Sequence, residues 1–152
     1  MKFLRVGELN KEKPAIIDEN GIIRDISTIV NELNPNTLND STIQLLKNTN
    51  IKKLNKIPNN IRIGACVSKP EKFIGIGLNY SDHARETGAK TPSEPIIFIK
   101  ANSCISGPND DVIIPRNSRK TDWEIELGII IGKKQNIFLK KNLLIIFLDF
   151  AL

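Results

Sequence analysis

The sequence predicts an α+β fold that is mostly β, with a small N-terminal α+β domain followed by a β domain of the barrel or sandwich type. Two observations predict it. From residue 61 onward, short apolar segments recur with glycines and prolines between them, which is typical of short strands joined by turns. Before residue 61, strand-like and helix-like patterns alternate, and the chain contains no internal repeat.

The first 60 residues read as a self-contained small domain. The segments "KFLRVG", "KPAIIDENG" and "IIRDIS" predict strands, with "DENG" as the hairpin turn between the last two. Two helices are predicted at "STIVNEL" and "NDSTIQLLKN", with N-caps at Ser27 or Thr28 and at Asp40 or Ser41. The polar, lysine-rich residues 49–60 are interpreted as a linker, so residues 1–60 form the first predicted domain.

The second predicted domain begins at residue 61 with "IRIGACV" and "KFIGIGL", two short strands. The segment "NYSDHARETG" predicts a helical turn closed by Gly88. Further strands are expected at "EPIIFIK", "DVIIPR" and "DWEIELGIIIG", with "SGPNDD" as a turn.

Composition limits the function classes. The chain of 152 residues is 40% hydrophobic and 26% charged, as in soluble globular proteins. Its net charge of +5 comes from scattered lysines with few aromatic residues among them, which argues against nucleic-acid binding. Cys66 and Cys104 have neither metal-ligand spacing nor a disulfide framework, and no segment reads as a signal peptide or a membrane span. We therefore expect a cytoplasmic protein.

Glu124 and Glu126 form the first candidate constellation. In a strand, residues i and i+2 share a face and lie roughly 6–7 Å apart, while Trp123, Ile125 and Leu127 would face the other way into packing. Two such carboxylates can converge on a hard divalent cation, Mg²⁺, Mn²⁺ or Ca²⁺. The alternative is an ordinary acidic, solvent-exposed strand face.

His83 and Glu86 form the second constellation. His83 is the single histidine of the chain, and in a helix Glu86 at i+3 would share its face. A histidine oriented by a carboxylate is the usual general base for taking a proton from water. The alternative is a surface histidine with an incidental acidic neighbour.

Taken in series, three segments carry a family resemblance: "KFIGIGLNYSDHARETG", "EPIIFIKANSCISGPNDDVIIP" and "TDWEIELGIIIGKK". From about Lys72 to Lys134 the sequence closely resembles the fumarylacetoacetate hydrolase family, in particular its bacterial ureidoglycolate lyase and 2,4-diketo-3-deoxy-sugar-acid hydrolase branch. The N-terminal part also resembles the small domain that precedes the catalytic fold in this branch. The resemblance implies that residues 61–134 are the first part of a mixed β-roll or sandwich.

The resemblance also implies a site. Glu124 and Glu126 match two ligands of Mg²⁺, Mn²⁺ or Ca²⁺, His83 and Glu86 match a water-activating dyad, and Lys100 matches a lysine at the edge of the site. Family members act on small oxo acids, cleave C–C bonds (or C–N bonds in lyases), and are commonly homodimers. A ureidoglycolate lyase, an oxaloacetate-type decarboxylase and a non-catalytic dimerisation module remain alternatives.

After Lys134 the resemblance is expected to end. The third metal-binding Asp of the family is expected beyond Leu152, and Asp149 does not match its place. Residues 135–152 are interpreted as an aberrant hydrophobic tail produced by a frameshift near Lys134, either natural or a sequencing error. The 152-residue chain is accordingly expected to bind a divalent ion weakly and to lack appreciable catalysis.

Overall fold

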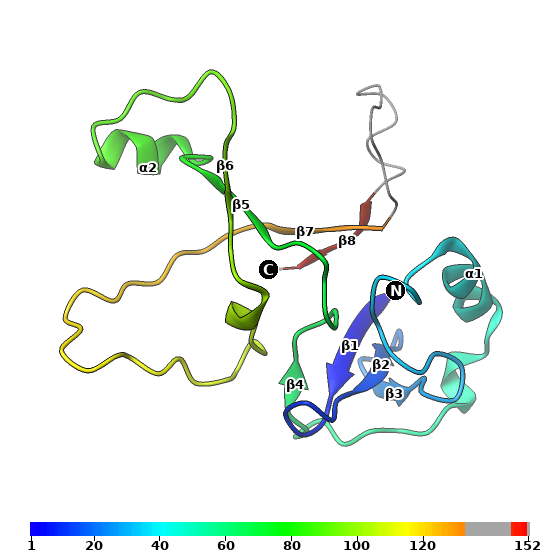
Figure 1. The fold of residues 1–152 in the computed structure, drawn as a ribbon. Coiled ribbons are helices and arrows are strands. Elements are labelled where there is room, and N and C mark those ends of the chain that lie inside the picture. Colours follow the sequence, from blue (N-terminus) through cyan, green and yellow to red (C-terminus); the bar gives the residue numbers. More distant parts are fainter. Residues whose placement is uncertain (133–146, 152) are drawn as a thin grey trace. The chain divides into compact units, whose positions relative to one another are not determined.

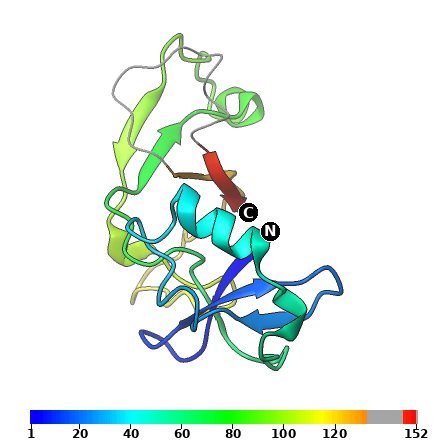
Figure 2. The same ribbon diagram turned by 90° about the vertical axis from the view of Figure 1, so that its right-hand side faces the viewer.

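The structure, a computed structural model, describes residues 1–132 and 147–151. The chain divides into two compact units, one made of Met1–Ser68 with Ser106–Leu152 and the other of Lys69–Ile105. Within the described ranges the elements are eight strands, two α-helices and two short 3₁₀-helices (Figures 1 and 2). The predicted predominance of β-structure is confirmed.

A four-stranded antiparallel sheet, in the order β3-β2-β1-β4, is the centre of the first unit (Figure 1). Its strands are β1 (Lys2–Val6), β2 (Lys13–Ile17), β3 (Ile23–Asp25) and the two-residue β4 (Ile63–Gly64). The three N-terminal strands lie where the sequence predicts them, because alternating apolar residues and strong turn residues determine them locally.

The predicted hairpin turn between β2 and β3 is confirmed, and Asp18 organises it. The Asp18 carboxylate accepts hydrogen bonds from the backbone N–H groups of Asn20 (2.9 Å) and Ile22 (3.0 Å), the usual role of Asp in a turn. Gly21 supplies the positive φ of 77° that the turn requires. The same carboxylate pairs with Arg24 at 2.9 Å, and both side chains are buried.

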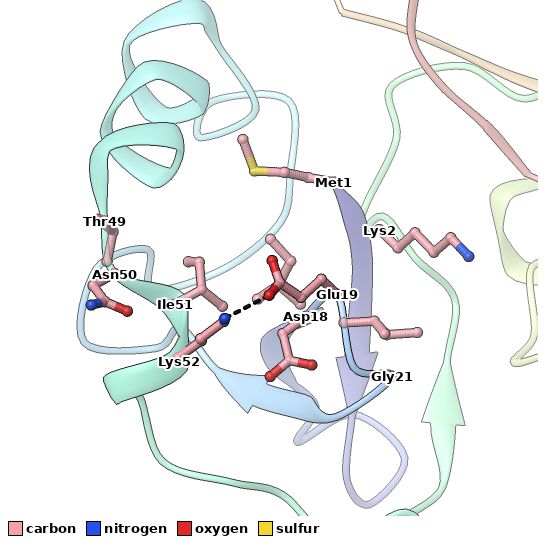
Figure 3. A pocket seen from close by; sticks show the side chains of 11 residues that line it. Met1, Lys2, Asp18, Glu19, Gly21, Thr49, Asn50, Ile51 and Lys52 are labelled. Carbon is pink, nitrogen blue, oxygen red and sulfur yellow. Dashed lines mark ion pairs between the residues drawn. The ribbon is translucent and has the colours of Figure 1, made fainter.

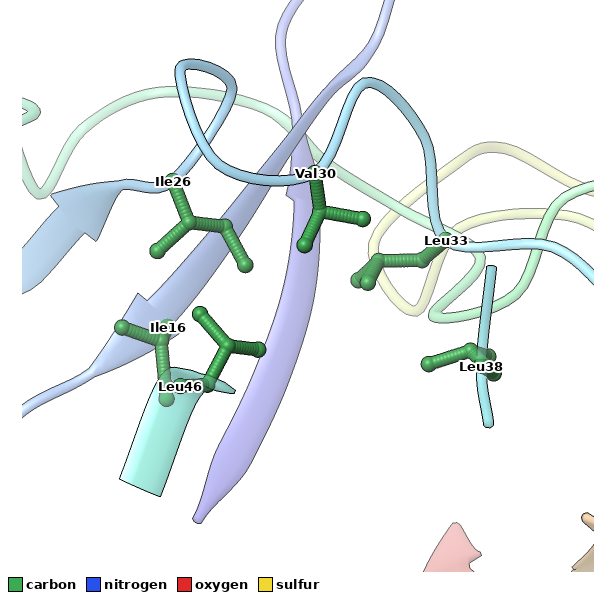
Figure 4. Packing of buried hydrophobic residues seen from close by; sticks show 6 residues of the cluster. All are labelled: Ile16, Ile26, Val30, Leu33, Leu38 and Leu46. Atoms are coloured by element: carbon green, nitrogen blue, oxygen red, sulfur yellow. The ribbon is translucent and has the colours of Figure 1, made fainter. Parts of the chain in front are cut away.

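Helix α1 (Asp40–Asn48) is confirmed, although its cap differs from the prediction. Asn39 is the N-cap in place of Asp40 or Ser41, and its side chain accepts a hydrogen bond from the Thr42 N–H at 3.0 Å. The helix contributes Leu46 to the main hydrophobic core of the unit. Figure 4 shows this cluster, whose six buried residues are Ile16, Ile26, Val30, Leu33, Leu38 and Leu46.

The prediction of a helix at "STIVNEL" is wrong, since residues 27–29 form only a turn. The Val30 N–H donates to the Ile26 carbonyl, and that single turn brings both side chains into the core. The Asp25 carboxylate holds the Ser27 N–H at 2.7 Å, which favours a turn over a helix. The β-branched residues that follow also disfavour a longer helix.

The segment interpreted as a linker, residues 49–60, packs on the first unit. It contains the 3₁₀-helix η1 (Ile51–Lys53), and Ile51 and Leu54 lie against the main core. Its backbone bonds to β3, with the Ile57 N–H donating to the Ile23 carbonyl at 2.9 Å. The lysines of this segment are exposed to water, while every third or fourth residue is apolar. Such a pattern is compatible with a segment packed against the domain as well as with a linker.

The second unit is an antiparallel hairpin of β5 (Ile74–Gly77) and β6 (Ile96–Ile99), with helix α2 (Ser81–Glu86) and the 3₁₀-helix η2 (Asn102–Cys104). These elements confirm the predicted strands and the predicted helical turn, and Gly88 closes that turn with a φ of 67°. Gly75 pairs with Phe98, whose ring lies so close that a Cβ on Gly75 would meet it at 2.3 Å.

Residues 111–127 differ from the prediction, because the structure assigns no strand to this segment. The strand begins only at β7 (Gly128–Ile131), which pairs antiparallel with β8 (Phe147–Ala151). A strand requires a hydrogen-bonded neighbour, and within the described ranges this segment has none, so Trp123, Ile125 and Leu127 are exposed instead of packed. Residues 133–146 and 152, which include most of the predicted aberrant tail (residues 135–152), lie outside the described residues.

Candidate functional site

Helix α2 carries the predicted histidine–carboxylate pair. His83 and Glu86 are both exposed and lie one helical turn apart in this six-residue helix. The turn is reinforced by the Thr87 hydroxyl, which donates to the His83 carbonyl at 3.0 Å. Among the described residues no hydrogen bond joins the His83 and Glu86 side chains, so the pair is available to water and the dyad role stays a prediction.

Lys100 directly follows β6 and is held by aromatic rings. Its Nζ lies 5.5 Å from the centroid of the Phe73 ring and 5.9 Å from that of Phe98, which is within the range of cation–π attraction. The Lys100 backbone N–H donates to the Phe73 carbonyl at 2.9 Å, extending the β5–β6 pairing by one step. The side chain therefore has a defined position on the hairpin while remaining exposed.

Glu124 and Glu126 lie in the exposed segment that precedes β7. The segment is not a strand, so the shared strand face expected for the two carboxylates does not follow from the fold. These residues are in the first unit, whereas His83, Glu86 and Lys100 are in the second, and each set is described within its own unit. The proximity of the two sets stays a prediction.

The donor chemistry at Glu124 and Glu126 fits a hard divalent cation, since carboxylate oxygens are the ligands such ions prefer. The number of donors does not complete a site: within residues 1–132 and 147–151, no three His, Cys, Asp or Glu side chains are grouped so that they could hold a metal ion. Two carboxylates alone would bind a divalent ion weakly.

A second charged cluster, which the sequence reading missed, lies in the first unit. It is a chain of alternating charges in the order Glu32, Arg5, Glu12, Arg62, Asp110, and we name it the five-residue ion network. Its central carboxylate, Glu12, has a side chain only 6% exposed. The members are scattered over the chain, and no local spacing in the sequence signals them.

The network determines the protonation of its acids. Burial raises the pKa of Glu12, but the hydrogen bond from Arg62 and the nearby charge of Arg5 outweigh it and hold this pKa below the usual 4.5. Burial likewise raises the pKa of Glu32, and the hydrogen bonds from Arg5 and the Leu33 N–H lower it further than burial raises it. The hydrogen bonds from Arg62 and the Gly107 N–H lower the pKa of Asp110.

These shifts predict acid sensitivity. A carboxyl whose pKa is lower in the folded than in the unfolded state stabilises the fold at pH values above its unfolded pKa, and this stabilisation disappears as the pH falls through the folded pKa. We therefore expect the urea midpoint of unfolding, followed by circular dichroism, to be constant from about pH 8 to 6 and to fall steadily from about pH 4.5 downward. A midpoint that rises on acidification would contradict the assignment.

The first unit has an open depression of about 830 Å³ beside the β2–β3 turn and η1 (Figure 3). Lys52 and Glu19 form an ion pair of 2.5 Å at its rim. Both side chains are more than half exposed, and all the predicted site residues lie elsewhere in the chain. The depression therefore carries no functional assignment.

Residues 72–142 match the family model for the fumarylacetoacetate (FAA) hydrolase C-terminal region. Among curated proteins, the chain is 50% identical over 132 residues to a "Putative hydrolase" of Burkholderia ambifaria, a match that covers 87% of this chain and 47% of the relative. Relatives of the same description from Burkholderia multivorans and Burkholderia cenocepacia are each 49% identical, over 132 and 134 residues. Residues 72–142 belong to the fumarylacetoacetate hydrolase family.

The family match begins where the sequence resemblance predicts, at Lys72, and extends to residue 142, beyond the expected end at Lys134. The matches to the relatives cover 87–88% of the chain, so they also include much of the N-terminal region. The chain spans about half the length of these relatives.

The fold of this chain is similar to that of a protein of known structure. The crystal structure described as that of a "putative HpcE protein" from Mycobacterium smegmatis matches 97% of this chain and 52% of its own, with a TM-score of 0.79 and 22% sequence identity. This likeness supports the fold alone. None of the helices in the described part of the chain has the length and apolar character needed to cross a bilayer.

Proposed function

We propose that this chain contributes the first part of the active site of a cytoplasmic, divalent-metal-dependent hydrolase that cleaves a C–C bond in a small 2,4-dioxo or related oxo acid. The observation that carries the proposal is that all five predicted site residues fall within the family-matched region, residues 72–142. Since the chain spans about half of its relatives, the reaction is proposed for the whole protein, folded as a mixed β-roll or sandwich and assembled as a homodimer.

Each residue has a proposed role. Glu124 and Glu126 provide two carboxylates for Mg²⁺, Mn²⁺ or Ca²⁺, which when bound supplies Lewis-acid polarisation of an oxo group. His83 takes a proton from water, and Glu86 orients its ring. Lys100, held at the β6 end by two aromatic rings, offers a positive charge to the carboxylate of the substrate.

The metal role is tested by calorimetric titration of the purified 152-residue chain with Mn²⁺. We expect weak binding, and we expect Glu124→Gln and Glu126→Gln each to weaken it further by roughly tenfold or more, because each removes a charged oxygen donor. Glu94→Gln, which alters an exposed carboxylate of the second unit, is the matched control and should leave Mn²⁺ binding unchanged. Equal affinities in all four proteins would contradict the assignment.

The reaction class is tested on the full-length protein with Mn²⁺ present. Release of pyruvate from an acylpyruvate supports the proposed hydrolase. Release of urea from ureidoglycolate, or decarboxylation of oxaloacetate, would replace it with the lyase or the decarboxylase. If none of these reactions occurs and Mn²⁺ does not bind, the protein is a non-catalytic module.

A further inference from the structure

Arg62, which lies just before β4, connects two acids through different N–H groups of its guanidinium. Its Nη1 donates to the Glu12 carboxylate at 2.8 Å, while its Nε and Nη2 donate to the two Asp110 oxygens at 2.7 and 2.6 Å. The Asp110 pairing is bidentate, the strongest geometry that an arginine and a carboxylate form. Lysine, with a single nitrogen, cannot reproduce this bridge.

Asp110 also fixes the turn to which it belongs. One of its oxygens accepts a hydrogen bond from the Gly107 N–H at 2.7 Å, and its own N–H donates to the Gly107 carbonyl. One carboxylate therefore closes the 107–110 turn and attaches it to Arg62. Asp111, the next residue, is exposed.

The turn lies directly against the backbone of β4. Gly107 is buried, and a Cβ at this position would meet the Ile63 carbonyl oxygen at 2.3 Å and the Gly64 Cα at 3.1 Å. Only a glycine permits so close an approach of two backbones. This contact is independent of the charges and identifies the same docking position.

The other end of the network is held by the N-terminal sheet. Glu12 accepts from both Arg62 and Arg5, and Arg5, a buried residue of β1, donates in addition to Glu32 at 2.7 and 3.0 Å. The Arg62 carbonyl accepts the Gly7 N–H at 2.9 Å, which ties the same residue to the end of β1 by its backbone.

We propose that Arg62 and Asp110 form a latch that holds the 107–110 turn on the N-terminal sheet, before the segment that leads to Glu124 and Glu126. The N-terminal sheet is then the support on which this turn docks. The latch is a local docking contact, able to open without unfolding the core. This inference rests on the contacts of Asp110 and Arg62 and does not depend on the proposed reaction.

Amide hydrogen exchange measured by NMR on the 152-residue chain tests the latch without metal or substrate. In Asp110→Asn, the carboxamide can still accept from Gly107 but the ion pair is lost. We expect exchange of the Gly107 N–H to accelerate on the order of ten- to a hundredfold, the effect of losing a charge-assisted hydrogen bond. The Val30 N–H, which donates within the core, should remain much better protected than the Gly107 N–H, because it opens only with the whole unit.

Two variants sharpen the test. Arg62→Lys keeps the positive charge but loses the guanidinium that bridges Glu12 and Asp110, so it should accelerate Gly107 exchange as Asp110→Asn does. Unchanged protection of the Gly107 N–H in Arg62→Lys would show that this bridge does not hold the turn. Asp111→Asn removes the neighbouring exposed carboxylate and should change nothing. Unchanged Gly107 exchange in Asp110→Asn would overturn the proposal.

The urea dependence of amide exchange in the unmodified chain tests the proposal even if a variant does not fold. A local opening exposes little surface, so Gly107 exchange should be nearly independent of added urea, whereas Val30 exchange should follow the urea dependence of global unfolding. The same urea dependence at both amides would show that the turn opens only with the whole unit and would refute a separable latch.

Discussion

Replacing Glu12 with alanine is expected to destabilise the first unit by about 3–5 kcal/mol. Glu12 is the central acid of the five-residue ion network, and its side chain is only 6% exposed. Its removal leaves the Arg5 and Arg62 guanidinium groups beside each other without the carboxylate that separates them. Breaking a buried charge network by removing one partner costs more than the network itself contributes, because the remaining charges stay desolvated.

The measurement is the free energy of unfolding from urea denaturation at neutral pH. Glu8→Ala is the matched control, because Glu8 lies in the same β1–β2 connection and pairs with Lys11, both side chains being 77% exposed. An exposed pair of this kind contributes less than about 1 kcal/mol. If Glu8→Ala and Glu12→Ala destabilise the protein equally, the network has no special role in stability.

Turn and strand residues at the N-terminus could be predicted because their determinants are local. Asp18, Asn20 and Gly21 specify the hairpin turn within four residues, and apolar alternation specifies the strands on either side. The helix at "STIVNEL" was predicted on the same local grounds and is wrong. There the Ser27 N–H donates to the Asp25 carboxylate, and Ile26 and Val30 are buried in the core; together these interactions favour a single turn over a helix.

The strand expected at residues 122–132, of which only residues 128–131 form a strand, shows the limit of a local pattern. Alternating Ile and Leu residues indicate strand propensity, but a strand forms only beside another strand, and the sequence of one segment does not say whether its neighbour is present. In the described part of the chain the pairing begins at Gly128, so the apolar residues around Glu124 and Glu126 are exposed.

The five-residue ion network could not be predicted, since each of its pairs joins residues that only the folded sheet and the 107–110 turn bring together. Arg62 and Asp110, for example, are 48 positions apart. By contrast, the candidate site residues were found from short motifs, and the family match now covers all of them. Their common location in one site depends on how the two units are arranged, which no motif specifies.

Replacing Leu46 with alanine is expected to destabilise the first unit by about 2–5 kcal/mol. Leu46 is 1% exposed and is the residue by which α1 enters the main core beside Ile16 (Figure 4). Alanine is an excellent helix former, so the loss comes from the missing methyl and methylene groups and the cavity they leave, not from helix propensity.

The adjacent Leu45 provides a matched control on the same helix. It is 53% exposed, and the hydrogen bond it receives from the Thr49 hydroxyl goes to its backbone carbonyl, which Leu45→Ala retains. Urea denaturation of the two variants should therefore give a change below about 1 kcal/mol for Leu45→Ala and the full core effect for Leu46→Ala. Similar losses for both would mean that α1 does not pack on the sheet through Leu46, and that the core of this unit is held by the sheet and the 26–38 region alone.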